Sequence, residues 1–163
     1  KVSVVVASFN GDRTLRACLE ALENLNYPDY EVVLVDDGST DNTAQLVENF
    51  RWGETPGRVN GPKLRFIRHD RNRGLSVARN TGIRVAAGDI IVFTDADCRP
   101  DADWLYYLIG DLLSGDFAAM GGHNLLPPDD WAVAAAVSCT KRLRVMVCVI
   151  FTSLLFRLKT IKR

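Results

Sequence analysis

The sequence predicts an α/β fold in which a mostly parallel sheet carries helices on both faces. Short apolar runs alternate with stretches of helical periodicity from residue 2 to about residue 120. The apolar runs are nearly continuous, as in strands that are buried on both faces. Two of them, 31–35 and 90–93, lead directly into acidic residues. Parallel strands end at a common edge, where α/β proteins bind their ligands, so the fold also predicts the place of a site.

Each predicted element follows from a local pattern. Strands are expected at five apolar runs: 2–8, 31–35, 64–68, 90–93 and 117–120. Four helices are expected where apolar or small residues recur at spacings of three and four: Leu15, Cys18, Leu19, Leu22 and Leu25; Ala44, Val47 and Phe50; Leu75, Ala78, Gly82, Val85 and Ala86; Trp104, Leu105, Leu108 and Leu112. The Gly- and Pro-rich stretch 51–63 predicts a loop. The small residues of the third helix predict a close approach to the sheet.

The composition fits one soluble globular domain, with 163 residues, 47% apolar and 25% charged. The formal net charge of zero hides an asymmetry: residues 1–130 hold 20 acidic and 13 basic residues, a net charge of −7. Residues 131–163 hold seven basic residues and no acidic one. The acidic balance of the first part, and arginines without interleaved aromatics, speak against nucleic acid as a partner.

Asp95 and Asp97 are the first candidate site residues, because they end the 90–93 strand and stand one residue apart. Such a pair can converge on a hard divalent cation, Mg²⁺ or Mn²⁺. Asp36 and Asp37 reach the same edge from the 31–35 strand. The simpler alternative is a polar turn, with Asp97 helping to cap the next helix. Two acidic strand ends at one edge favour a site.

Arginines near these carboxylates could bind an anionic ligand through paired hydrogen bonds: Arg68, Arg71, Arg73, Arg79 and Arg84. Arg79 is the favoured one, because it lies in the small-residue helix. The sequence has neither the G-x-x-x-x-G-K-[ST] loop nor a G-x-G-x-x-G turn after its first strand. Phosphates would then be held through a metal on Asp95 and Asp97.

Four segments in this order carry a family resemblance: VSVVVASFN, EVVLVDDGSTDNT, NRGLSVARNTGI and GDIIVFTDADC. They resemble the family 2 glycosyltransferases, which have the GT-A nucleotide-diphospho-sugar-transferase fold. The resemblance covers residues 2 to about 105, and the D-x-D motif of 95–97 makes it specific. It implies a donor-binding part over 1–125, followed by a basic, apolar segment over 126–163.

The resemblance also implies roles for single residues. Ser8, Phe9 and Asn10 would border the nucleotide base, and Asp36, with Asp37 as a second candidate, would hydrogen-bond the uracil or ribose. Arg79 would lie near the base or the diphosphate. Asp97 would be the metal ligand of the D-x-D motif, and Asp95 would contact ribose or metal. Gly38, in contrast, is interpreted from turn geometry alone, because Gly adopts positive φ at least strain.

The activity implied is transfer of a sugar, with inversion, from a nucleotide-diphospho-sugar (UDP-sugar in the first instance) to a hydroxyl of a glycan, lipid or protein. Mg²⁺ or Mn²⁺ would assist. The family's catalytic Asp is expected many tens of residues after the D-x-D motif, but only 66 residues follow Asp97. The one later acidic pair, Asp129–Asp130, follows Pro127–Pro128 and resembles a turn and helix cap. No catalytic base is therefore named, and a truncated or inactive donor-binding module is the alternative.

The basic, apolar tail, residues 126–163, allows several interpretations. Val145–Phe156 is uncharged and flanked by basic residues, so 141–163 could contact a membrane surface. It could also start an acceptor domain or membrane segment, or form a helix that covers the sheet; the run is too short to predict a span. The four cysteines show neither a C-x-x-C pair nor zinc spacing, so they are expected to be reduced and structural. A cytoplasmic location is expected, at the membrane face if the tail binds lipid.

Two other protein classes share parts of this pattern. A phosphoacceptor receiver domain would use residues such as Asp36, Asp37, Asp95 and Lys141, but a complete strand and helix precede the acidic pair here. A haloacid-dehalogenase-type phosphatase would use residues such as Asp95 and Asp97. In that class the acidic motif follows the first strand, whereas here it follows the fourth predicted strand. Both are disfavoured.

Overall fold

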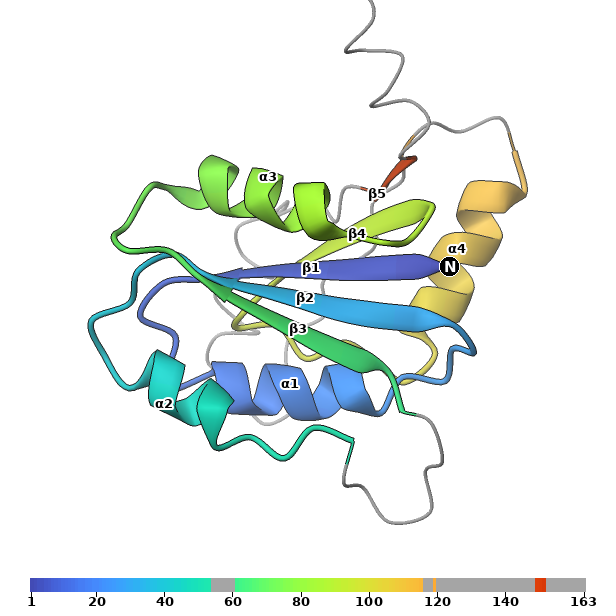
Figure 1. The fold of residues 1–163 in the computed structure, drawn as a ribbon. Coiled ribbons are helices and arrows are strands. Elements are labelled where there is room, and N and C mark those ends of the chain that lie inside the picture. Colours follow the sequence, from blue (N-terminus) through green and yellow to red (C-terminus); the bar gives the residue numbers. More distant parts are fainter. Residues whose placement is uncertain (54–60, 116–118, 120–148, 152–163) are drawn as a thin grey trace, which may run out of the picture.

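The computed structural model describes residues 1–53, 61–115, 119 and 149–151. They form a five-stranded sheet in the order β3-β2-β1-β4-β5 (Figure 1). The strands are β1 (Val2–Ser8), β2 (Tyr30–Asp36), β3 (Lys63–Arg68), β4 (Ile90–Asp95) and β5 (Val149–Phe151). The helices are α1 (Leu15–Glu23), α2 (Thr43–Glu48), α3 (Leu75–Val85) and α4 (Trp104–Leu113). Strands β1 to β4 are parallel, and β5 runs antiparallel to β4, so the predicted fold class is confirmed.

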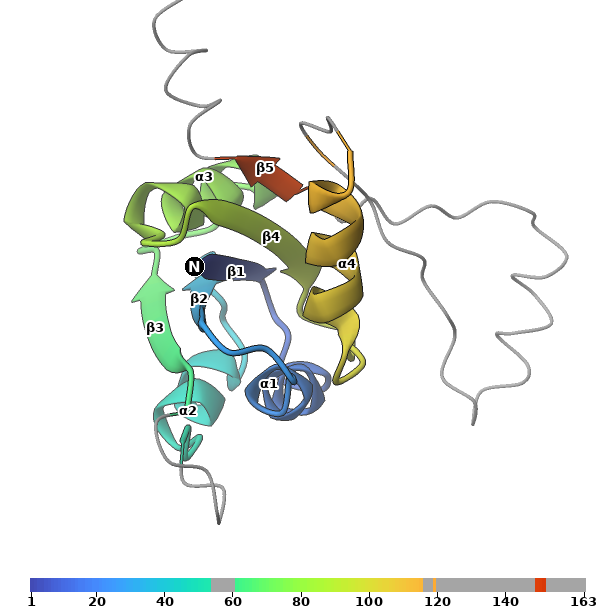
Figure 2. The ribbon, with the colours of Figure 1, turned by 90° about the vertical axis from the view of Figure 1, so that its right-hand side faces the viewer.

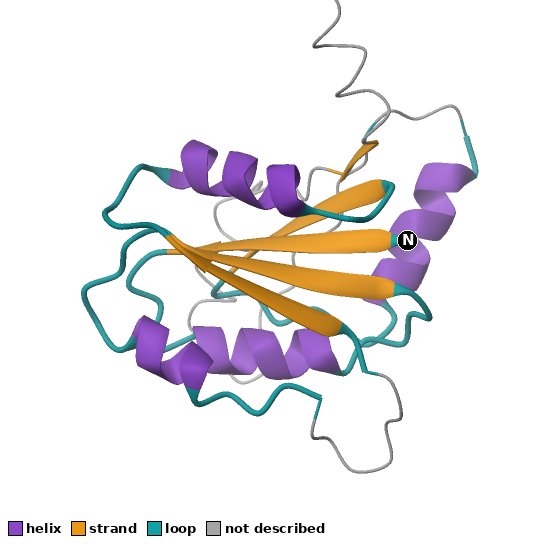
Figure 3. Cartoon of the chain, in the orientation of Figure 1, coloured by secondary structure: helices purple, strands orange, loops and turns teal. Residues whose placement is uncertain are grey.

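The helices cover the two faces unequally (Figures 1 and 3). Among the described helices, only α3 packs on one face, where Ala78 contacts inward residues of the central strands such as Val5 and Phe93. Helices α1 and α4, with Val47 of α2, share the core of the other face. Figure 2 shows the strands from their amino ends, with α3 and α1 on opposite sides of them. Both cores exist because β1, β2 and β4 present apolar side chains to both faces of the sheet, as the sequence predicts.

The strand order has its switch point at β1. The chain first moves from β1 to β2 and β3, and then returns past β1 to β4. Ser8, at the end of β1, pairs with Asp36 of β2, and its neighbour Ala7 pairs with Asp95 of β4. The two acidic strand ends therefore flank the end of β1, which is where open α/β sheets bind ligands.

The close approach of α3 to the sheet is confirmed at Gly82. A Cβ on this glycine would lie 2.3 Å from Cγ1 of Val5. No side chain fits there without displacing the helix or the strand. This contact fixes the height of α3, and of the arginines it carries, above β1.

The predicted strand boundaries are right to within two residues at each of the first four strands. The expected strand at 117–120 lies outside the described residues except for Ala119, which is in no strand. The fifth strand is β5, so a helix, one of the alternatives for the tail, does not apply to residues 149–151; they pair with the outer edge of β4. The rest of the 126–163 segment, Asp129–Asp130 included, is outside the described residues. Among the described residues, no helix has the length and apolarity to cross a membrane.

Candidate functional site

The loop after β1 is joined by hydrogen bonds to residues 39–43, which follow β2. The backbone amides of residues 10–12 donate to side chains of 39–43: Asn10 N to Ser39 Oγ at 2.8 Å, Gly11 N to Thr43 Oγ1 at 2.9 Å, and Asp12 N to Asp41 Oδ2 at 3.1 Å. Side chains of residues 39–43 therefore accept hydrogen bonds from the backbone of the loop after β1. These contacts hold the two segments together at this edge of the sheet.

Asp36 is completely buried at the end of β2. Its Oδ1 accepts hydrogen bonds from the Ser39 amide, at 3.0 Å, and from the Ser39 hydroxyl. Its Oδ2 lies 3.3 Å from Arg68 Nε, but this ion pair does not have hydrogen-bond geometry, and Oδ2 has no hydrogen-bond partner. A buried carboxylate oxygen left in this state is uncommon in folded proteins and marks a place where a donor is missing.

Ser8 carries the second such atom. Its Oγ is buried without a hydrogen bond, and Ser8 and Asp36 are the only residues with such an atom in the described part of the chain. The hydroxyl lies beneath Gly11, where a Cβ would be 2.5 Å from Ser8 Oγ. The two unsatisfied oxygens therefore belong to residues that are paired across β1 and β2.

The other two residues of the predicted S-F-N group lie differently. Phe9 is 48% exposed at the edge of the sheet, an unusual position for a large apolar ring. Asn10 has a φ of 52°, and its Oδ1 accepts a hydrogen bond from the Thr40 amide at 2.9 Å. Phe9 therefore offers a free ring face, and the carbonyl of Asn10 is committed to the loop.

Asp37 is also buried, but its oxygens are occupied. Oδ1 is 2.6 Å from His69 Nδ1, and the backbone amides of Arg73 and Gly74 donate to the carboxylate at distances of 2.7–3.1 Å. Burial alone raises the pKa of Asp37, but the hydrogen bonds from His69, Arg73 and Gly74 outweigh it and hold the pKa below its ordinary value. Asp37 therefore holds the segment between β3 and α3 against the end of β2.

The carboxylate of Asp95 is paired with Arg79. Arg79 Nη2 donates to Asp95 Oδ1 at 3.0 Å, with the two side chains 35% and 38% exposed. The Arg79 guanidinium also lies over the ring of Phe93, with its carbon 5.8 Å from the ring centroid. Asp97 is exposed beyond this pair. The structure thus brings Arg79 from α3 to the end of β4, as the sequence analysis expected.

The donor set suits a hard divalent cation that a ligand completes. Asp95 and Asp97 offer carboxylate oxygens, and no group of three or more possible ligands occurs among the described residues. Mg²⁺ is typically held by one or two carboxylates together with phosphate oxygens of a substrate, so two carboxylates fit. The nearby thiols are less suited: burial raises the pKa of Cys18 to about 12, and burial also raises that of Cys98.

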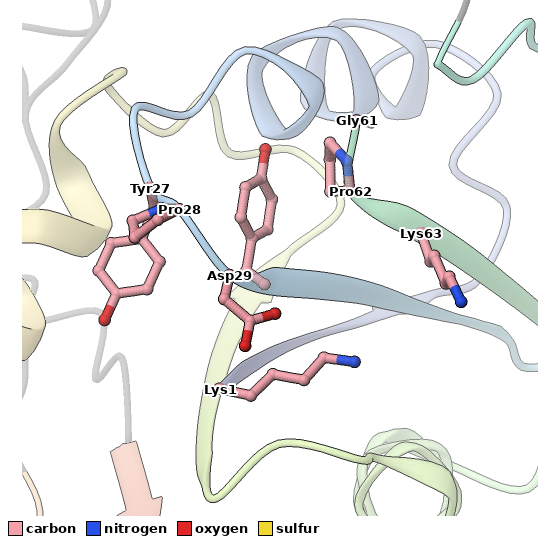
Figure 4. A pocket seen from close by; sticks show the side chains of 8 residues that line it. Lys1, Tyr27, Pro28, Asp29, Gly61, Pro62 and Lys63 are labelled. Carbon is pink, nitrogen blue, oxygen red and sulfur yellow. The ribbon is translucent and has the colours of Figure 1, made fainter. Parts of the chain in front are cut away.

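One hollow of the described surface lies away from these carboxylates. A cavity of about 360 Å³ opens at the amino ends of the strands, lined by residues that include Lys1, Asp29 and Lys63 (Figure 4). Parallel α/β sheets bind their ligands at the opposite edge. The carboxylates and the two unsatisfied buried oxygens are all at that opposite edge, so they, and not the size of the cavity, locate the candidate site.

Two residues at the end of a third strand also contribute to this edge. Arg68, one of the five candidate arginines but not the favoured one, is in register with Asp36 and donates to the Ser39 carbonyl oxygen at 3.0 Å. His69, which was not picked from the sequence, is buried against Asp37. Arg68 is the last residue of β3, and His69 follows it. That position was the available signal.

The family model for glycosyl transferase family 2 matches residues 3–144. The chain belongs to glycosyltransferase family 2. The family 2 resemblance stated from the four sequence segments is therefore confirmed.

Curated relatives agree with this membership. Glycosyltransferase AglE of Haloferax volcanii is 32% identical over 124 residues, which is 75% of this chain and 38% of AglE. Poly-beta-1,6-N-acetyl-D-glucosamine synthase of Staphylococcus epidermidis is 31% identical over 110 residues, 68% of this chain and 25% of the synthase. The chain thus matches well under half the length of either relative.

Solved structures agree on the fold. The mannosyltransferase PcManGT of Pyrobaculum calidifontis, in complex with GDP-Man and Mn²⁺, superposes with a TM-score of 0.73 at 30% identity, covering 96% of this chain and 46% of that one. TarS 1–349 of S. aureus, in complex with UDP-GlcNAc, gives 0.70 at 23% identity, covering 98% and 47%. The chain has the GT-A fold of these enzymes.

Proposed function

We propose that this chain is the donor-binding part of an inverting glycosyltransferase and holds a nucleotide-diphospho-sugar at the carboxyl edge of β1, β2 and β4. One observation carries the proposal: the two described residues with an unsatisfied buried oxygen, Ser8 and Asp36, are paired at this edge. Each lacks a partner that a ligand could supply. Both flank the fold's switch point together with Asp95.

The nucleoside is assigned to the β1–β2 side of the site. Asp36 Oδ2 can accept a hydrogen bond from a base N–H or a ribose hydroxyl, and the exposed ring of Phe9 can stack on the base. Stacking of a base on an aromatic ring contributes about 1–3 kcal/mol. Uracil remains the proposed base; PcManGT binds a guanosine diphospho-sugar, so GDP is the alternative that an experiment must include.

The diphosphate is assigned to the β4 side. Asp95 and Asp97 would hold Mg²⁺ or Mn²⁺, which supplies charge neutralisation for a departing nucleoside diphosphate. Arg79 already lies 3.0 Å from Asp95, so its guanidinium can move between this carboxylate and a phosphate oxygen. The Phe93 ring supports the arginine from below and limits the positions that it samples.

The acceptor hydroxyl of a glycan, lipid or protein would attack the anomeric carbon from the face opposite the leaving group, which inverts the configuration. Such an attack needs a base for the acceptor proton. Asp95 at the end of β4, and Asp12, Asp41 and Asp97 in the loops, lie at this edge. The Asp41 carboxylate accepts hydrogen bonds from the Asp12 and Thr43 amides, and none of the four is assigned as the base. A donor-binding module without turnover is therefore the second candidate.

Calorimetric titration with UDP, GDP and CDP in the presence of Mn²⁺ tests the donor site. Tighter binding of UDP than of the other two by at least tenfold supports the uracil assignment, and equal affinities contradict it. A hydrolysis assay with UDP-GlcNAc on the same sample separates the two candidates. Release of free sugar supports an enzyme, whereas binding without release supports the module.

The division into a donor-binding part over 1–125 and a basic tail over 126–163, and membrane contact by 141–163, stay predictions. Co-sedimentation with vesicles that contain anionic lipid tests the contact, and with it a place at the cytoplasmic face of a membrane. Pelleting of the intact chain, and its loss on removal of 141–163, is expected. No pelleting of the intact chain contradicts it.

A further inference from the structure

His69 lies where three elements meet. It follows β3, and its backbone amide donates to the Asp36 carbonyl oxygen at 2.8 Å. Its ring is buried, with Nδ1 2.6 Å from Asp37 Oδ1 and Nε2 3.0 Å from Thr81 Oγ1. One side chain thereby joins the end of β2 to helix α3. Neither the sequence motifs nor the donor-site roles above use it.

The first of these contacts holds the segment between β3 and α3. The carboxylate that accepts from His69 also accepts from the backbone amides of Arg73 and Gly74. On the same segment, the backbone of Arg71 approaches Gly38 so closely that a Cβ on Gly38 would lie 2.3 Å from its carbonyl carbon. Residues 69–74 are therefore packed against the end of β2 with no space between the two backbones.

The second contact holds the helix. Thr81 belongs to α3, and its hydroxyl also donates to the Val77 carbonyl oxygen, one turn earlier, at 3.0 Å. Arg79 lies between these two residues in the sequence and reaches Asp95 from the same helix. Because a helix moves as a rigid rod, a contact at Thr81 restrains the rotation and height of α3 and hence the position of the Arg79 guanidinium.

We propose that His69 is a positioning residue for the nucleotide site: it locks α3 to the end of β2 so that Arg79 stays in reach of Asp95 and of a bound diphosphate. The ligand part of this inference rests on the proposed function. The restraint on Arg79 does not, because it concerns contacts within the chain. His69 touches none of the reacting atoms and acts through Asp37 and Thr81.

A matched structural network exists at the opposite edge. Glu31 is buried there, and its Oε1 accepts from Ser3 Oγ at 2.7 Å and from the Ala87 amide at 2.6 Å. This network also ties a strand to the chain that follows α3, but it lies at the amino ends of the strands. Ser3→Ala removes two hydrogen bonds, the one that the Ser3 hydroxyl donates to Glu31 and the one that it accepts from the Gly88 amide, and serves as the control for a loss of stability alone.

Three variants separate the two contacts of His69. His69→Leu keeps neither contact. His69→Asn keeps an N–H group near the position of Nδ1, and His69→Gln keeps one near the position of Nε2. The measurements are the affinity for UDP with Mn²⁺, and the ¹H–¹⁵N signal of the Arg79 Nε–H group in the ligand-free protein, all well below the unfolding temperature of each variant. His69→Leu is expected to weaken UDP binding at least tenfold and to shift or broaden the Arg79 signal.

Two comparisons separate a positioning role of His69 from a purely structural one: recovery of the Arg79 signal in the conservative variants, and coupling between the His69 and Arg79 substitutions. His69→Gln, which can still reach Thr81, is expected to recover the Arg79 signal better than His69→Asn. Arg79→Ala is expected to weaken UDP binding at least tenfold in the wild type, and less than threefold in the His69→Leu background. Ser3→Ala is expected to lower the unfolding temperature with UDP affinity and Arg79 signal unchanged.

The contrary results are equally distinct. A folded His69→Leu protein with an unchanged Arg79 signal overturns the inference, and so does full additivity of the His69 and Arg79 effects on UDP affinity. A wild-type chain that binds no nucleoside diphosphate overturns the proposed function instead. In that case the Arg79 signal of His69→Leu in the ligand-free protein still decides the positioning role.

Discussion

Ser8 and Asp36 stand opposite each other at the ends of β1 and β2, and each carries a buried oxygen without a hydrogen bond. If only stability mattered, each of these oxygens would be expected to have a hydrogen-bond partner or to be replaced by an apolar group. In this chain they border the loops that carry the family's sequence signature, which is where departures from stability are expected.

Ser8→Ala therefore has opposite effects on stability and binding. Removing a buried hydroxyl that makes no hydrogen bond should leave the free energy of unfolding unchanged or raise it by up to about 1 kcal/mol. The same change should weaken UDP binding several-fold, because the ligand loses a partner. Urea unfolding and calorimetry measure the two effects. Loss of stability with unchanged affinity would show that the hydroxyl has a structural partner.

Gly82→Ala is expected to destabilise the fold, because its Cβ would lie 2.3 Å from Val5 Cγ1. Overpacking of this kind typically costs about 1–3 kcal/mol. Gly110→Ala in α4 is the matched control, since nothing lies within 4 Å of the added methyl group. It should stabilise the protein by up to about 1 kcal/mol through helix propensity. Equal unfolding midpoints for the two variants in urea would disprove the close approach of α3 to β1.

Gly38→Ala separates backbone strain from close contact. Gly38 and Gly53 both have positive φ, 73° and 82°, but only Gly38 faces another backbone. Gly53→Ala should cost about 1–2 kcal/mol, the penalty of a left-handed conformation. Gly38→Ala should cost clearly more and should also weaken UDP binding, because the Arg71 backbone must move. Thermal unfolding and calorimetry test this, and equal losses for both variants would remove the role given to the contact.

Asp37 predicts a dependence of stability on pH. Its pKa is held below the ordinary value in the folded state, so the unfolded state binds the proton more tightly. The contribution of Asp37 to stability is therefore complete above the unfolded pKa of about 3.9 and is lost as the pH falls through the lower folded pKa. Asp37→Asn should be less stable than the wild type at pH 6, with a difference that shrinks below about pH 4. A difference that stays constant over this range would contradict the assignment.

The sequence predicts the sheet well because the central strands β1, β2 and β4 are mostly apolar, and it predicts the site edge because acidic residues end β2 and β4. It does not separate Asp36 from Asp37, which are adjacent in the chain. Only the fold shows that His69, Arg73 and Gly74 all contact the Asp37 carboxylate. One oxygen of Asp36, in contrast, has an ion pair with Arg68 but no hydrogen bond. His69 was missed for the same reason: its partners are 32 and 12 residues away in the sequence.

The tail shows the limit of periodicity. Strand β5 has three residues, too few to display a period, and it is defined by pairing with the edge of β4 and not by its own pattern. Its apolar neighbourhood is compatible with a helix, a strand or a membrane contact. Long-range pairing of this kind is decided by the partner strand.

The most direct test of the donor site is calorimetric titration of UDP with and without Mn²⁺, on the wild type, Asp97→Ala and Asp111→Ala. Asp111 is an exposed aspartate of α4 and controls for the loss of one surface charge. We expect Mn²⁺-dependent binding to the wild type and to Asp111→Ala, and at least tenfold weaker binding to Asp97→Ala. Absence of heat with the wild type, or equal affinity in all three proteins, would contradict a metal-assisted nucleotide-sugar site at the end of β4.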